Sequence, residues 1–270
     1  MNLDSNGLVI SGGDGGDSCQ RQYEIFLRLA ILSKIGIAPI ALPTNLASPA
    51  QAQALLEVKP GIYVRNPDPT QWYSNPNTTS RDQLTPPLCY HSYMSFHGDK
   101  DSRKTLGRLL WACIKRGMFA QNDRPDGGGN WKIPDFLDPS LWSIFLRGSK
   151  TASLLLYPLL MLGDFVQLIG TALSIWGPII TNGTLSFTSR DPNDVDDNNM
   201  NNVMNVAQYT IPTPFSWLSR KMYKKYRQQN DGNTQMGETS AIMGAMVWYD
   251  RLPAGNPEIP ELARPIVERY

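Results

Sequence analysis

A glycine-rich segment near the start of the sequence brings an acidic and a basic side chain within reach of one another. It reads GGDGGDSCQR at residues 12–21, and its glycines let a ligand approach the backbone closely. Asp17 and Arg21 are four positions apart, so on a helix the guanidinium can lower the pKa of the carboxyl. Asp17 is therefore a candidate catalytic acid or base, and Arg21 is a candidate substrate ligand. The alternative is that Asp17 caps a helix and Arg21 is its surface partner.

A second segment, residues 65–83, combines charged and aromatic side chains on a backbone stiffened by prolines. An aromatic platform beside arginine and aspartate side chains is typical of sugar sites. Asp82 is expected in the first turn of a helix, where the helix dipole favours an anion, and it is the candidate second carboxylate. The candidate substrate ligands of this segment are Arg65, Asp68, Trp72, Tyr73 and Arg81. The alternative is an ordered surface loop that ends in a helix cap.

Tyr90 and His91 follow on the helix that Asp82 begins. His91 lies about two and a half helical turns beyond Asp82, so the two side chains could line one groove at different depths. A Tyr/His pair can abstract a proton, which makes both residues candidate catalytic groups. A histidine satisfied by hydrogen bonds in the core is the alternative. The chain has only 2 histidines, which excludes a histidine-rich metal site.

An amide-rich stretch follows an acidic cluster at residues 191–199. Four asparagines recur at helical spacing from Asn198 to Asn205, so on a helix they form one stripe. Amides that face a cleft can hydrogen-bond sugar hydroxyls, which makes Asp197, Asn198 and Asn202 candidate substrate ligands. A solvated helix face is the alternative, and calcium held by the aspartates is a third option.

Helices must position these side chains, because strand patterns are confined to residues 62–65 and 184–188. Two capping-box patterns, Asp17 with Gln20 and Ser80 with Gln83, each open a helix. Apolar periodicity predicts helices at residues 18–34, 80–96, 105–119, 139–146, 151–162, 165–175, 195–209, 214–228, 237–249 and 257–268. The expected fold class is all-α, with a single domain over residues 1–270 and long loops rich in Gly, Pro and Asn.

Composition excludes several classes of function. The chain of 270 residues carries 25 Lys plus Arg against 24 Asp plus Glu, a net charge of +1. Without a block of like charge, it is not expected to bind nucleic acid. Cys19, Cys89 and Cys113 lack C-x-x-C spacing, so they predict buried thiols rather than disulfides or a zinc site. No export signal is visible, and the localisation stays open.

Residues 151–180 form the most apolar stretch of the sequence. Pro158, Gly163, Asp164 and Gln167 interrupt it before the roughly 20 apolar residues that a bilayer-spanning helix needs. We therefore expect no membrane span, and instead two helices that break near Gly163 and Asp164. Because both are apolar nearly all round, we expect them to be buried on all sides.

Five short segments, taken in order, resemble a pattern found in little-characterised bacterial and phage proteins. They are GGDSxxR at 15–21, NPDPTxWY at 66–73, SRDQ at 80–83, DDNN at 196–199 and PTPxSWL at 212–218. The whole is similar to the (α/α) toroids of many glycoside hydrolases and polysaccharide lyases. For a hydrolase the resemblance implies an acidic pair at a cleft, and for a lyase it implies a Tyr/His pair with Arg and Asn.

Together these patterns predict an enzyme that cleaves glycosidic bonds in a polysaccharide or oligosaccharide, without a cofactor or metal. Hydrolysis would use Asp17 and Asp82 as acid and base. In the alternative, a lyase, His91 or Tyr90 takes the proton and Arg81 or Arg65 neutralises the substrate carboxylate. A further alternative is a noncatalytic glycan-binding or phage structural protein. We predict that Asp17, Arg21, Arg81 and Asp82 meet in one pocket, because both motifs lie where a segment ordered by Gly and Pro enters a helix.

Overall fold

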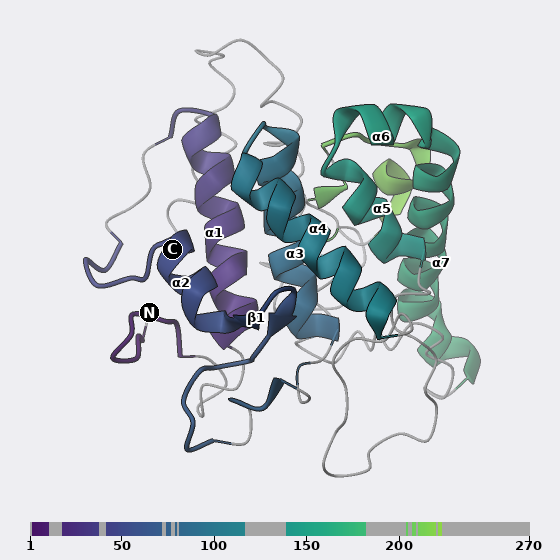
Figure 1. Ribbon diagram of the computed structural model, residues 1–270. Helices are drawn as coiled ribbons and strands as arrows, with labels where there is room; N and C mark the ends of the chain where they lie inside the picture. The colour runs from purple at the N-terminus through teal and green to yellow at the C-terminus, as the bar shows by residue number, and fades with distance from the viewer. Residues whose placement is uncertain are drawn as a thin grey trace. The chain divides into compact units, whose positions relative to one another are not determined.

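The computed structural model describes residues 2–10, 18–37, 42–71, 74–76, 79, 81–116, 139–181, 204, 207–208, 210–219 and 221–222. For residues 81–82, 170–171 and 173–181 it describes the backbone alone. The described part is mostly helical, which confirms the all-α class. Its elements are α1 (Ser18–Lys34), α2 (Pro49–Leu56), β1 (Glu57–Lys59), β2 (Ile62–Tyr63), α3 (Arg81–Phe96), α4 (Lys100–Lys115), α5 (Pro139–Arg147), α6 (Lys150–Leu155) and α7 (Tyr157–Thr181) (Figure 1).

Contacts divide the chain into two compact units. The first unit comprises Met1–Leu27 and Ala41–Asp138, and the second comprises Arg28–Ile40 and Pro139–Tyr270. Helix α1 therefore contributes its first part to one unit and its last part to the other. A single domain over the whole chain stays a prediction.

Helices α1, α3 and α5 begin within a residue of where the sequence patterns predict. Helix α4 starts earlier than the predicted residue 105, because Asp99 caps it by accepting a hydrogen bond from the Ser102 N–H at 2.9 Å. Helix α2 is absent from the prediction although its signal is present. Ser48 and Gln51 form a reciprocal capping box, with Pro49 in the first turn.

A short antiparallel hairpin follows α2 directly. Glu57 pairs with Tyr63, and Lys59 pairs with Ile62. Gly61 closes the turn with a φ of 74°, a conformation that favours glycine. The strand expected at residues 62–65 thus pairs with residues 57–59, while residues 184–188 lie outside the described part of the chain.

The core of the first unit is built from aromatic rings on α1, β2 and α3. Tyr23 of α1 lies at the centre, with ring centroids 5.6 Å from Phe26, 6.1 Å from Tyr63 and 5.6 Å from Tyr90. Edge-on and tilted aromatic pairs add attraction beyond the area they bury. The three cysteines are buried thiols, as the sequence predicts.

Helix α7 in the second unit runs without a break through Gly163 and Asp164, so the predicted break there is wrong. The interruption falls between α6 and α7, just before Pro158. Gly163 instead allows α7 to pack against α5, since a Cβ at this position would lie 2.4 Å from the Pro139 carbonyl oxygen. Within the described ranges no helix is both long and apolar enough to cross a membrane.

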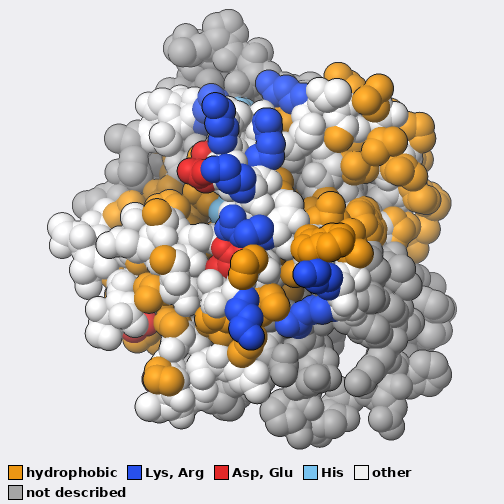
Figure 2. Space-filling view, in the orientation of Figure 1, with side chains coloured by type: hydrophobic (Ala, Val, Ile, Leu, Met, Phe, Trp, Pro, Cys, Tyr) orange, Lys and Arg blue, Asp and Glu red, His pale blue; other side chains and the backbone are white. Residues whose placement is uncertain are grey.

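The expectation that residues 154–175 are buried on all sides is also wrong. Leu154 and Leu155 are 70% and 75% exposed, whereas Leu160, Asp164 and Gln167 are fully buried. On α7, Asp164 and Gln167 therefore face the interior, whereas Leu159 and Leu162 face outward. Hydrophobic side chains accordingly gather on the surface over α6 and α7 (Figure 2).

Candidate functional site

The N-terminal ends of α1 and α3 are joined by a reciprocal pair of buried glutamines. The backbone N–H of Gln20 donates to Gln83 Oε1 at 3.3 Å, and Gln83 Nε2 donates to Gln20 Oε1 at 3.1 Å. Both residues are fully buried. The thiol of Cys19 also donates to the Gln83 carbonyl at 3.7 Å. The two glutamines that the capping-box patterns assign to local roles thus pair with each other across 63 positions.

The second sequence motif joins the same place through its first residues. Asn66 Nδ2 donates to Ser18 Oγ at 2.8 Å, and the Cys19 N–H donates to the Arg65 carbonyl at 2.8 Å. Asn66 is buried. The described parts of the motifs at residues 12–21 and 65–83 therefore lie together at the start of α1, although the sequence separates them widely.

The two candidate carboxylates adjoin this junction in the chain. Asp17 directly precedes Ser18, and Asp82 directly precedes Gln83 in the first turn of α3. Asp17 lies outside the described residues, and for Asp82 and Arg81 the structure describes the backbone alone. The candidate ligands Trp72, Tyr73, Asp197, Asn198 and Asn202 also lie outside the described part.

Arg21 and Asp68 make local contacts. Arg21 forms an ion pair with the buried Glu24 at 3.0 Å, in addition to any contact with Asp17. Asp68 accepts hydrogen bonds from the N–H and hydroxyl of Thr70 at 2.9 and 2.7 Å, which hold its pKa below the usual value. Asp68 is thus an anion that shapes its own turn on the surface.

His91 and Tyr90 are buried in the core of the first unit. The His91 Nδ1 atom lies 3.0 Å from Ser102 Oγ, and its Nε2 atom lies 2.9 Å from Gln53 Oε1. Burial lowers the pKa of His91 to about 4, and burial together with the charge of Asp99 raises the pKa of Tyr90 to about 12. Both ring nitrogens of a neutral histidine are engaged, which favours the alternative of a histidine satisfied in the core.

Gln53, which the sequence patterns do not single out, is the centre of this polar network. Its Oε1 accepts hydrogen bonds from the Tyr23 hydroxyl and from His91, and its Nε2 donates to the Tyr63 hydroxyl at 2.7 Å. Gln53 Nε2 also donates to Glu57 at 2.5 Å. Gln53 on α2 and Glu57, the residue that follows α2, are four positions apart, and the sequence prediction lacks this contact because it lacks α2.

Glu57 connects the network to α4 through Arg108. The guanidinium donates to both carboxylate oxygens, at 2.8 and 2.6 Å, and the Gly61 N–H donates at 2.6 Å. Burial opposes the charged form, yet these hydrogen bonds hold the pKa of Glu57 below its usual value. The network joins α2, the hairpin and α4, and its polar groups hydrogen-bond one another.

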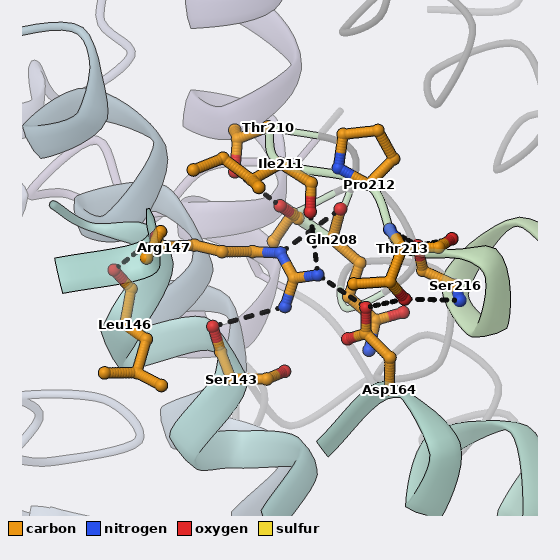
Figure 3. Close-up of polar contacts among 12 residues, drawn as sticks. Ser143, Leu146, Arg147, Asp164, Gln208, Thr210, Ile211, Pro212, Thr213 and Ser216 are labelled. Carbon is orange, nitrogen blue, oxygen red and sulfur yellow. Dashed lines mark hydrogen bonds and ion pairs between the residues drawn. The ribbon is translucent and has the colours of Figure 1, made fainter. Parts of the chain in front are cut away.

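The second unit contains a fully buried ion pair. Arg147 of α5 donates to Asp164 of α7 at 2.6 Å, and Thr213 donates to the same carboxylate oxygen at 2.6 Å (Figure 3). The other guanidinium bonds go to the backbone carbonyls of Ser143, Gln208 and Ile211. The PTPxSWL motif at 212–218 thus has a structural role, since its threonine holds the segment against α7.

The described side chains form no candidate metal site. No three of their His, Cys, Asp or Glu residues cluster in a way that could hold a metal ion. The acidic cluster at residues 191–199, to which the calcium alternative applies, lies outside the described part. Comparisons of the chain with protein-family models, with curated proteins and with solved structures find no match.

Proposed function

We propose that this chain hydrolyses glycosidic bonds in a polysaccharide, with Asp17 and Asp82 as its two catalytic carboxyl groups. The observation that carries the proposal is the pairing of Gln20 with Gln83. It holds the N-terminal ends of α1 and α3 beside one another, and each candidate aspartate stands one or a few residues from that pair in the chain. The resemblance to glycan-cleaving toroids, a finer architecture that we also propose, supports the same reading.

Two helix N-termini suit the chemistry of such a pair. The dipoles of the two helices stabilise negative charge near these ends, which favours the ionised form of one carboxylate. The other carboxyl, kept protonated, would give its proton to the leaving oxygen, while the ionised one activates water or attacks the sugar. A carboxyl separation of roughly 6.5–9.5 Å would give inversion, and about 5 Å would give retention.

Neighbouring residues would bind the sugar. Asn66, anchored to Ser18, holds the start of the loop that carries Asp68, Trp72 and Tyr73. In the proposal the aromatic pair stacks on a sugar ring, while Arg21, Arg65 and Arg81 donate to its oxygens.

Elimination by a lyase has less support. Its proton acceptor would be His91 or Tyr90, but the two nitrogens of His91 already contact Ser102 and Gln53. A Tyr90 hydroxyl with a pKa of about 12 is a poor base at neutral pH. Binding without catalysis is distinguished from hydrolysis by the experiment that follows.

The experiment assays the full chain against neutral and acidic polysaccharides, measuring both new reducing ends and the absorbance of unsaturated sugar products. We expect reducing ends without unsaturated products. Asp17→Asn and Asp82→Asn should each lower the rate on the order of a hundredfold or more, the scale of a lost acid or base. Both variants should fold, because asparagine caps a helix about as well as aspartate at position 17, and Asp82→Asn keeps a side chain of the same size in the first turn of α3.

Asp99→Asn is the matched control, because Asp99 caps α4 in the same first unit. It should keep full activity, and His91→Gln should lose little. Full activity in both the Asp17 and Asp82 variants would contradict the proposal, and a dead His91→Gln variant with unsaturated products would establish elimination instead. If the parent chain and its variants bind a glycan but none of them cleaves it, the chain is a binding protein.

A further inference from the structure

Nine large apolar side chains form one exposed surface on the second unit, which we name the leucine face. Their exposed fractions lie between 38% and 75%. The face comprises Leu154, Leu155, Leu156, Leu159, Leu162, Phe165, Ile169, Trp217 and Leu218. Monomeric soluble proteins rarely leave so many neighbouring apolar side chains in water, so the leucine face indicates a binding surface.

The leucine face is continuous across two segments that are distant in the sequence. On α7 its members recur every three or four residues, which places them along one side of the helix. The helical residues 214–219 lie beside them, since the Phe165 and Phe215 rings are 5.2 Å apart and Thr213 donates to Asp164. Leu218 shares the side of this helix that carries Phe215, and Trp217 is exposed on the same helix, so the apolar surface continues from α7 onto residues 214–219.

The polar groups of the same elements point inward. Asp164, Gln167 and Arg147 are fully buried, and so are Ser143 and Ser216. Polar contacts thus hold α5, α7 and the 210–219 segment together from within, as in Figure 3. The exposed leucines take no part in these internal contacts, so we expect a partner outside the chain to cover the leucine face.

Charge distinguishes between the possible occupants. Within the described residues from 139 onward, Asp164 is the only acidic side chain, and it is buried. Lys150 is exposed at the start of α6, and the Lys221 ammonium lies 5.1 Å from the centre of the Trp217 ring. The sequence then continues as SRKMYKKYR over residues 219–227, which holds five basic residues and no acidic one.

We propose that the leucine face binds the surface of an anionic lipid bilayer. Apolar side chains enter the boundary between headgroups and acyl chains, and lysines such as Lys150 and Lys221 meet the anionic headgroups. Tryptophan beside a basic residue is typical of this boundary. A second copy of the chain would bring two positive edges together, which charge repulsion disfavours.

The test is co-sedimentation of the full chain with vesicles of phosphatidylcholine alone and of phosphatidylcholine mixed with phosphatidylglycerol in equal parts. We expect sedimentation with the mixed vesicles and little with the neutral ones. Leu155→Ser combined with Leu159→Ser should weaken binding on the order of tenfold or more. The assay contains no glycan, so its result is independent of the proposed hydrolysis.

The first unit offers a matched control. Trp111 on α4 is 57% exposed and its ring lies 5.3 Å from the Lys115 ammonium, which reproduces the Trp217 and Lys221 arrangement outside the leucine face. Trp217→Ser should weaken vesicle binding, and Trp111→Ser should not. Equal effects of the two substitutions would overturn the proposal, because binding would then not depend on the leucine face.

Two further outcomes would also overturn it. If the chain ignores both vesicle types and runs as a dimer that the leucine substitutions dissociate, a second copy covers the face. If the leucine substitutions lower the melting temperature by several degrees and no vesicles bind, another part of the same chain covers the leucine face. The expected result is an unchanged melting temperature, because the side chain of Leu155 is mostly in water.

Discussion

The two units differ in which side chains fill the interior and which face the solvent. In the first, aromatic rings around Tyr23 fill the interior, and the polar atoms of Gln53 and His91 satisfy each other there. In the second, a buried ion pair between Arg147 and Asp164 holds the helices together, while Leu159 and Leu162 face outward. The comparison teaches that an apolar sequence stretch identifies a helix but does not say which side of that helix is inside.

The largest effect that sharpens this comparison is expected at the ion pair of the second unit. Asp164→Asn leaves the guanidinium of Arg147 buried without a counter-charge, and such a loss costs about 3–5 kcal/mol. Urea denaturation would measure it, and hydrogen exchange should report faster opening of α5 and α7 first. The exposed Asp101→Asn is the control and should change stability by less than about 0.5 kcal/mol.

The double variant Arg147→Met with Asp164→Leu examines the same pair from the other side. Replacing a buried ion pair by apolar residues is often neutral, so the double variant should recover most of the stability that Asp164→Asn loses. A double variant as unstable as the single one would mean that the buried polar contacts to Thr213 and the backbone matter more than the charges.

The polar network of the first unit should make stability depend on pH. The pKa of His91 is about 4 in the folded chain and 6.5 when unperturbed, so the folded chain binds fewer protons between these values. Its contribution is complete above pH 6.5 and is lost as the pH falls to 4, by up to about 3 kcal/mol. Urea midpoints measured across this range should fall for the parent chain and stay flatter for His91→Gln. Parallel curves would contradict the role of this histidine.

Helix packing in the second unit can be broken by one methyl group. A Cβ at Gly163 would lie 2.4 Å from the Pro139 carbonyl oxygen and 2.6 Å from Ser143 Cβ. Gly163→Ala should therefore push α7 away from α5 and destabilise the chain by about 1–3 kcal/mol. Thermal unfolding would detect this, and an unchanged melting temperature would mean that the two helices do not pack this closely.

The smallest effect is a gain in the first unit. Gly107 lies inside α4, and a Cβ there would meet no atom within 4 Å. Gly107→Ala should stabilise the helix by about 0.5–1 kcal/mol, because alanine loses less backbone entropy than glycine. The same thermal measurement applies, and a loss of stability would indicate that this face of α4 has a close neighbour.

Local signals predicted much of the fold. The apolar periodicity of residues 18–34 coincides with α1, and proline followed by an apolar run marks the start of α5. The break proposed at Gly163 failed because a glycine in a helix has two meanings, an end or a close contact, and only the neighbouring α5 decides between them. The prediction that the exposed leucines of α7 are buried is wrong for a related reason, since the inward position of Asp164 depends on its ion pair with Arg147.

Part of the candidate site could be predicted from the sequence. The sequence motifs that contain Ser18, Asn66 and Gln83 do lie together, which their polar and glycine-rich character suggested. How they meet was not predictable, because a glutamine in a capping-box position can pair with its own helix or with a distant one. Pairing between Gln20 and Gln83 requires two helix starts to be adjacent, which is information that local spacing does not contain.

One measurement tests the central claim most directly. A crystal structure of the full chain would give the distance between the carboxyl groups of Asp17 and Asp82. We predict roughly 5–9.5 Å, the range that covers both glycosidase geometries. A separation beyond about 12 Å would contradict it, because no single sugar linkage could then meet both groups.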